Sequence, residues 1–85
     1  EGKFLDYSTI QGVDAEFIEV EVKPDCDVLG KKLRDLNFPK DGIIGGLTRG
    51  DKAFFPRGDF EFEVEDRVII VTKKETKNTI ELMFK

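Results

Sequence analysis

The stretch of residues 30–39 places the tightest limits on how this chain can fold. Its leucines recur at the spacing of one helix face, and Pro39 cannot continue a helix. The apolar pair Ile43-Ile44 follows at once, and the turn sequence Arg49-Gly50-Asp51 comes directly after it. We therefore predict a short helix, a strand and a tight turn, in that order.

The helix is predicted over residues 28–36. Leu29, Leu33 and Leu36 recur at i, i+4 and i+7, so they form an inward stripe. Asp27 is placed to accept backbone N–H bonds at the helix start. The residues between the leucines would face solvent: Lys31, Lys32, Arg34 and Asp35.

Strands are predicted on both sides of this helix. Residues 15–22 alternate with period two, which gives one buried face formed by Ile18, Val20 and Val22. Residues 42–49 form the next strand, and Gly45-Gly46 indicates a bulge packed beneath the helix.

The second half of the chain predicts a hairpin at residues 49–52 leading into 53–55, and another turn at 56–59. Residues 60–64 alternate again, and residues 67–72 are an apolar, β-branched run that suits the central, most buried strand. Residues 73–85 are compatible with a helix. The apolar side chains of these segments are Phe60, Phe62, Val64, Ile80, Met83 and Phe84.

Residues 1–14 show no sustained period, and we predict a connecting arm there, followed by one domain over residues 15–85. The predicted fold class is α+β: a small, mainly antiparallel β-sheet with one or two helices. The chain begins at Glu1 without a methionine, so we expect it to be a piece of a longer protein.

Composition excludes several function classes. The net charge is −4 and the basic residues are scattered, so we do not expect nucleic-acid binding. One cysteine, Cys26, allows no internal disulfide, and neither a signal peptide nor a transmembrane run is present. A cytoplasmic domain without direct membrane insertion fits best. A chain of 85 residues has a small core that a second copy would help to stabilise.

No feature of the sequence indicates an enzyme or a metal site. Histidine is absent, which removes the commonest acid-base and metal-binding side chain. Asp25 and Asp27 fall short of the oxygen ligands that a hard cation needs, so turn formation is favoured. Glu19 and Glu21 share one strand face, where a solvated surface is favoured over paired catalytic carboxylates.

The remaining candidates have simple structural explanations. The integrin-type tripeptide Arg49-Gly50-Asp51 is better explained as a hairpin turn, and Arg57 as a turn residue that pairs with Asp59. Phe54 and Phe55 point to opposite sides of their strand, so one of them is a candidate for a dimer interface.

The order of these elements resembles the C-terminal domain of TrkA-type potassium-transport regulators, also called the RCK C-terminal domain. The resemblance covers roughly residues 15–72. It rests on the ordered set Glu19-Val20-Glu21-Val22, Gly30, Leu33, Leu36, Pro39, Arg49-Gly50, Pro56, Gly58-Asp59 and Asp66.

The resemblance implies a two-fold dimer whose cleft holds a regulatory ligand. Some members of this family bind cyclic di-AMP there. In this sequence, Ile43, Ile44 and Leu47 would supply apolar walls and Arg49 would supply donors to phosphates. NAD or ATP would bind only through a Rossmann domain outside this chain.

The function that the resemblance implies is a cytoplasmic sensing domain that gates potassium flux. It would act beside a membrane channel or transporter subunit, at the inner face of the membrane. Two alternatives stay open: a constitutive dimerisation scaffold, and a regulatory domain of another cation or anion transporter.

Overall fold

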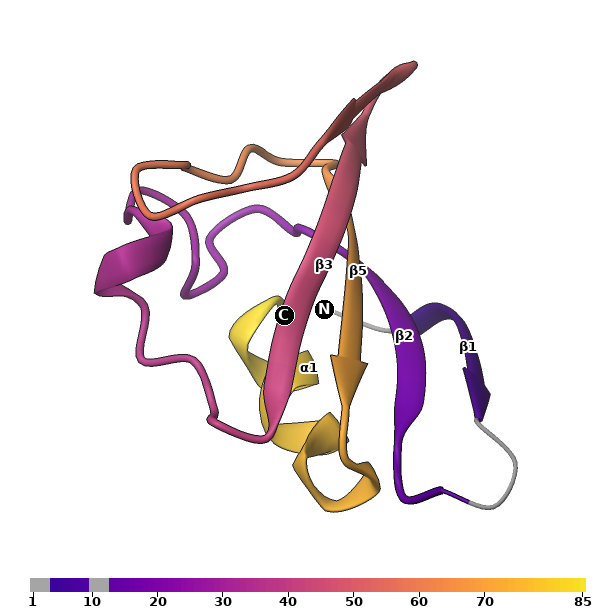
Figure 1. Cartoon of the computed structure of the whole chain (residues 1–85). Coiled ribbons are helices and arrows are strands. Elements are labelled where there is room, and N and C mark those ends of the chain that lie inside the picture. Colours follow the sequence, from indigo (N-terminus) through magenta and orange to yellow (C-terminus); the bar gives the residue numbers. More distant parts are fainter. Residues whose placement is uncertain (1–3, 10–12) are drawn as a thin grey trace.

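The computed structural model describes residues 4–9 and 13–85, with side chains from Val13 onward. Its elements form one antiparallel sheet and a C-terminal helix (Figure 1). The five strands lie in the order β1-β2-β5-β3-β4. Their bounds are β1 Phe4–Thr9, β2 Glu16–Glu21, β3 Gly42–Arg49, β4 Lys52–Phe54 and β5 Arg67–Thr72.

The predicted central strand is confirmed, because β5 pairs with β2 on one side and with β3 on the other. The alternation in β2 also buries the predicted face: Ile18, Val20 and Val22 are at most 1% exposed. Across the sheet they meet Val68 and Ile70 of β5, which are fully buried as well. The core therefore lies on one face of the sheet, which we call the inner face.

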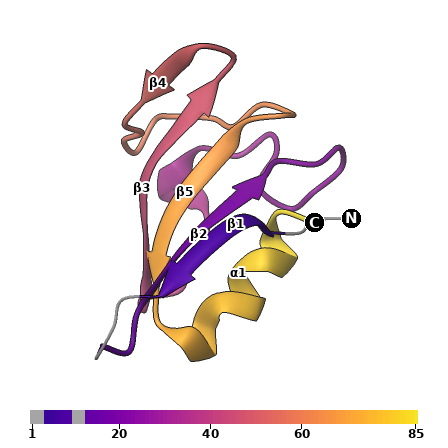
Figure 2. The same cartoon turned by 90° about the vertical axis from the view of Figure 1, so that its right-hand side faces the viewer.

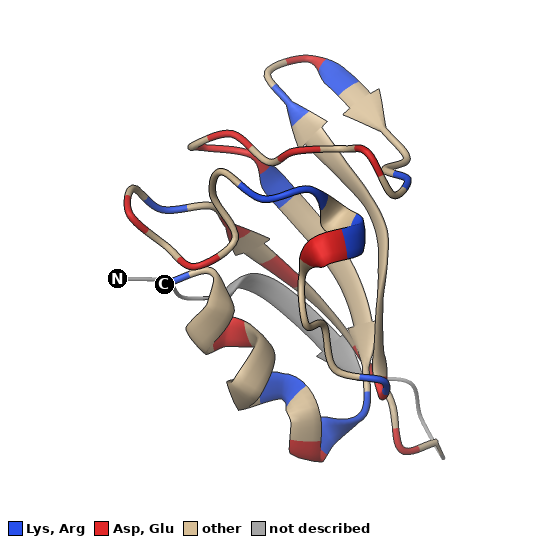
Figure 3. Cartoon of the chain, turned by 90° about the vertical axis from the view of Figure 1, so that its left-hand side faces the viewer, with Lys and Arg blue, Asp and Glu red and all other residues tan. Residues whose placement is uncertain are grey.

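The C-terminal helix covers the inner face. A 3-10 turn, η2 (Lys74–Thr76), leads into α1 (Lys77–Met83), which lies on one side of the sheet in Figures 2 and 3. Ile80 and Phe84 are fully buried in the core cluster. Lys77 Nζ lies 2.8 Å from Glu16 Oε1, so an ion pair ties the start of α1 to the start of β2.

The two glycines of β3 form the predicted bulge, since the register with β5 shifts between Ile44 and Gly46. The bulge is not packed beneath residues 28–36. A Cβ added at Gly46 would instead lie 3.3 Å from the Phe54 carbonyl oxygen and 3.5 Å from the Phe55 ring. The absent side chain lets the chain after β4 approach β3.

The prediction of a helix over residues 28–36 is wrong, whereas the prediction that its leucines face the core is confirmed. Only η1 (Leu33–Asp35), a single 3-10 turn, forms there. Gly30 has φ +77°, which a right-handed helix cannot include. The backbone N–H groups of Leu33 and Arg34 bond to the carbonyls of Phe60 and Gly58. The leucine stripe, Leu29, Leu33 and Leu36, still packs on the core.

Two further expectations need correction. Residues 60–64 do not form a strand, because only Glu61 makes an isolated bridge, to Lys32, and Val64 is 44% exposed. Part of the predicted arm, residues 1–14, lies in the sheet: β1 pairs with β2 along one edge.

Both charge signs are spread over strands, loops and helix (Figure 3). Within residues 4–9 and 13–85, no helix has the length and apolarity to cross a bilayer.

Candidate functional site

The β3–β4 hairpin leads into a loop that lines a groove on the surface. Gly50, with φ +62°, allows the tight turn between the two strands. After β4 the chain runs through Phe55 and Pro56 to a second turn, where the Phe60 amide bonds to the Arg57 carbonyl at 2.9 Å. This turn lies beside η1, because the Arg34 amide donates to the Gly58 carbonyl at 3.0 Å.

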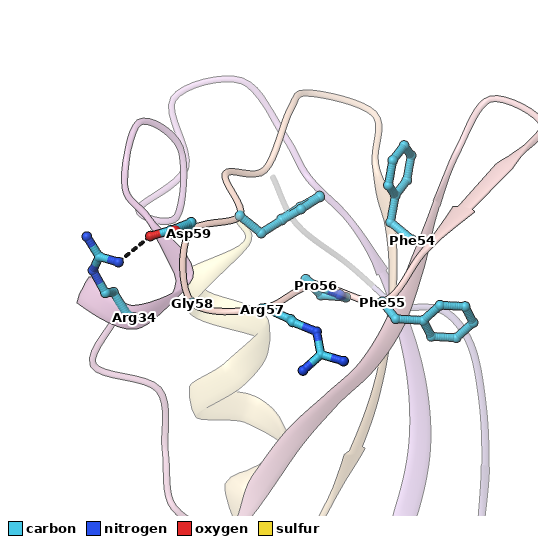
Figure 4. A pocket seen from close by; sticks show the side chains of 8 residues that line it. Arg34, Phe54, Phe55, Pro56, Arg57, Gly58 and Asp59 are labelled. Atoms are coloured by element: carbon cyan, nitrogen blue, oxygen red, sulfur yellow. Dashed lines mark hydrogen bonds and ion pairs between the residues drawn. The ribbon is translucent and has the colours of Figure 1, made fainter.

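Together these segments border a shallow groove of about 460 Å³, which we call the aromatic groove (Figure 4). It is lined by Arg34, Phe54, Phe55, Pro56, Arg57, Gly58, Asp59 and Phe60. The volume is within the range of small-molecule sites, roughly 300–1,000 Å³.

One side of the groove carries guanidinium groups. Arg34 pairs with Asp59, and both side chains are more than half exposed. In Figure 4, Arg57 lies between Arg34 and Phe55. The guanidinium of Arg57 has no hydrogen bond or ion pair with any residue that the structure describes. The sequence had paired Arg57 with Asp59, and the structure assigns that carboxylate to Arg34.

Phe54 and Phe60 form an aromatic wall of the groove, and successive ring contacts connect this wall to the core. Phe54 and Phe60 have centroids 5.9 Å apart, Phe60 and Phe62 5.6 Å, and Phe62 and Phe84 5.7 Å. The last two pairs are edge-to-face, a favoured aromatic geometry. The groove wall is thereby packed continuously against the end of α1.

An ion pair joins the end of β3 to the residue just before β5. Arg49 Nε lies 2.8 Å from Asp66 Oδ1 and Nη2 lies 2.9 Å from Oδ2, so the pair is bidentate. Asp66 is 1% exposed and also accepts the Glu63 amide at 2.9 Å. The hydrogen bond to Asp66 raises the pKa of Arg49 and outweighs the opposing effect of burial.

Arg49 contacts the groove from its inner side. Its guanidinium lies 5.0 Å from the Phe54 ring centroid and 5.1 Å from that of Phe60, within cation–π range. It also bonds to the Glu61 carbonyl at 3.3 Å and pairs with Glu63 at 3.1 Å. We call this cluster, Arg49 with Asp66 and its partners, the Arg49–Asp66 hub.

The four predicted ligand residues do not gather on one face. Ile43 points to the outer face of the sheet and is 65% exposed, whereas Ile44 is partly buried on the inner face. Leu47 is 2% exposed, and Arg49 is engaged in its hub. Sequence reasoning missed Arg34 as a groove residue, because its neighbour Gly58 is distant along the chain.

The outer face of the sheet carries a second candidate surface. Phe17, Val71 and Ile43 are neighbours across β2, β5 and β3, and Ile69 follows on β5. Phe17 is 43% exposed and Ile69 is 37% exposed. We call these four residues the outer apolar patch. Phe55, 76% exposed, lies near it beside Gly46, whereas Phe54 is half-buried.

The other candidates from the sequence form no site among the described residues. Cys26 is buried as a free thiol, and Glu21 pairs with Lys23 at 3.4 Å. Within the described part of the chain, no group of three or more Cys, Asp or Glu residues could hold a metal ion.

Comparison with known proteins gives one consistent family. A sequence model of the TrkA-C domain matches residues 17–85. A "Trk system potassium uptake protein TrkA homolog" of Archaeoglobus fulgidus is 41% identical over 68 residues, which cover 80% of this chain and 15% of that protein. "Trk system potassium uptake protein TrkA homolog 1" of Methanosarcina mazei is 36% identical over 78 residues, 92% of this chain and 17% of that protein.

A third relative has the same printed description. The Pyrococcus abyssi "Trk system potassium uptake protein TrkA homolog" is 38% identical over 60 residues, which are 69% of this chain and 26% of that protein. The chain therefore spans between a seventh and about a quarter of the length of these relatives.

Proposed function

The chain belongs to the TrkA-C domain family, and from this premise we propose that it is the regulatory, ligand-sensing domain of a potassium transport system. The observation that carries the proposal is the match over residues 17–85 together with relatives described as potassium uptake proteins. The match includes the groove, the hub and the outer face.

A sensing domain of this kind acts through an assembly. The proposed partners are a second copy of this domain, a Rossmann domain that would bind NAD or ATP, and a membrane channel or transporter subunit. The proposed location is the cytoplasmic side of the membrane. The domain is proposed to have no catalytic role.

The outer apolar patch supports a second copy as a partner. Apolar side chains that remain exposed on one sheet face, opposite a helix-covered face, are typical of an interface. Two sheets that pack face to face would bury Ile43 and Phe17, the most exposed members of the patch. Phe55 extends this surface past the β3 bulge.

The ligand proposed for the dimer cleft is cyclic di-AMP. A ligand between two copies gates flux if it prefers one dimer geometry over another. A preference of about 1–3 kcal/mol is typical of such coupling. Ile43 is exposed on the outer face, where it would line such a cleft, whereas Leu47 and Arg49 would act from within the fold.

Potassium or rubidium uptake tests this function. We would compare cells that carry the whole protein with cells that carry it without residues 15–85, at matched protein levels. We expect uptake to lose its response to cyclic di-AMP in cells that carry the shortened protein. Uptake with unchanged regulation would contradict the proposal. A constitutive scaffold would instead show altered assembly with no ligand response in either protein.

A further inference from the structure

We propose that Arg67 and Glu21 decide the direction in which a second copy packs on the outer face, by pairing with each other between the two copies. The two-fold axis then lies parallel to β5. This geometry rests on the dimer proposed above, to which it adds a direction and the residue pair that selects it.

The outer face is apolar at one end and polar at the other. Strands β2, β5 and β3 lie side by side in Figure 1, and their register defines cross-strand rows. The apolar row is Phe17, Val71 and Ile43, and the polar row is Glu21, Arg67 and Thr48. Ile69 lies between the two rows on β5. The face therefore has a direction along its strands.

Two such faces can pack with the two-fold axis parallel or perpendicular to β5. A parallel axis sets each row against the same row of the second copy, so that Phe17 meets Ile43 and Val71 meets itself. A perpendicular axis sets the apolar row against the polar row. Burying Arg67 or Glu21 against apolar side chains is costly, which disfavours the reversed packing.

Arg67 is available for a contact between copies. It is exposed, and its guanidinium has no hydrogen bond or ion pair with any residue that the structure describes. Glu21 is its neighbour across the strands but pairs with Lys23, at 3.4 Å. That distance is long for a charge-assisted bond, which is about 2.7–2.9 Å. Both side chains border a polar hollow of about 380 Å³.

A parallel axis brings these opposite charges together. It exchanges β2 and β3, so Glu21 of the second copy comes to lie opposite Thr48, one strand away from Arg67. Packed sheets are about 10 Å apart and neighbouring strands about 4.8 Å apart, which the two long side chains can span together. Symmetry makes the contact twice. Because both Arg67 side chains lie near the axis, Glu21 also offsets their repulsion. Charge pairs at such a border fix register and partner choice more than affinity.

Cross-linking of cysteine variants with a short bis-maleimide tests the direction of packing. Phe17→Cys mixed with Ile43→Cys is expected to give at least fivefold more linked heterodimer than Ile43→Cys mixed with Thr48→Cys. The parent chain is the control, since Cys26 is buried. The opposite preference would overturn the parallel axis. A dimeric parent whose variants link in neither mixture would overturn packing through this face and leave the sensing function in place. A monomeric parent would overturn both the geometry and the dimer.

Charge reversal tests the residue pair itself. Arg67→Glu and Glu21→Arg are each expected to weaken the dimer at least fivefold, measured by light scattering over a range of concentrations. An equal mixture of the two variants is expected to form heterodimers within twofold of the parent affinity. Residues 21 and 67 of one chain stay alike in charge whether a variant is alone or mixed. Recovery in the mixture therefore reports a contact between copies, and a mixture no tighter than the single variants would overturn the pairing.

Discussion

At the scale of single residues, Arg49 shows why a donor that is visible in the sequence need not be a ligand donor. Its turn position suggested an exposed guanidinium. The structure shows that Asp66, buried 17 residues further along, accepts two of its hydrogen bonds. A buried carboxylate without a countercharge is costly, so loss of Arg49 would destabilise the fold. No local pattern around Arg49 indicates this partner.

We predict that Arg49→Gln lowers the free energy of unfolding by about 3 kcal/mol, because it leaves the buried Asp66 without a countercharge. Chemical denaturation with urea measures the change. The matched control is Arg34→Gln, which breaks an exposed Arg–Asp pair and should cost less than about 1 kcal/mol. If both variants lost the same free energy of unfolding, the burial of Asp66 would not make its ion pair with Arg49 more important than an exposed pair.

At the scale of elements, sequence patterns predicted strands and turns correctly where residues close in sequence determine them. Period-two alternation identified β2, the apolar β-branched run identified β5, and the Gly50 turn identified the β3–β4 hairpin. The pattern failed where pairing between distant segments decides the backbone. The leucine spacing over residues 28–36 reports burial correctly, but the amides there bond to residues 58 and 60 instead of to their own turn.

We predict that Gly30→Ala destabilises the domain by roughly 1 kcal/mol, because alanine is strained at φ +77°. A helix at this position would give the opposite sign, since alanine stabilises helix interiors by about 1 kcal/mol relative to glycine. The control is Gly45→Ala, where φ is not positive and the nearest atom to an added Cβ is 3.7 Å away. Thermal melts of the two variants decide between the conformations.

The candidate site was predictable only in part for the same reason. The alternation of Phe54 and Phe55 predicted that one of the two is an interface candidate, and the structure shows that Phe55 is the exposed one. The groove depends on the approach of η1 to residues 56–60, and turn chemistry alone explained Arg57 without it. The sequence feature that could have indicated the groove is the group of phenylalanines at residues 54–60, together with Arg34 and Arg57.

At the scale of the whole molecule, one sheet face is covered by α1 and the other keeps its apolar patch exposed. This asymmetry explains why such a small chain would gain from a second copy. The family match extends over both faces, from residue 17 to residue 85. The role of the domain is thus expected to depend on what the outer face contacts.

We predict that Ile43→Glu converts the proposed dimer to a monomer, because it places a charge on the most exposed residue of the outer apolar patch. Leu82→Glu is the matched control, since Leu82 is 57% exposed on α1, away from the patch. Light scattering over a range of concentrations gives the mass of each variant. A monomeric parent chain, or dissociation by both variants alike, would show that the patch is not the interface.

Isothermal titration of this domain with cyclic di-AMP tests whether it senses a ligand as a dimer. ATP and NADH serve as control ligands, and the solution mass is determined on the same sample. We expect saturable binding of cyclic di-AMP near one molecule per dimer, with no saturable binding of NADH. A dimer that binds no cyclic di-AMP would contradict the sensing role and favour a constitutive scaffold.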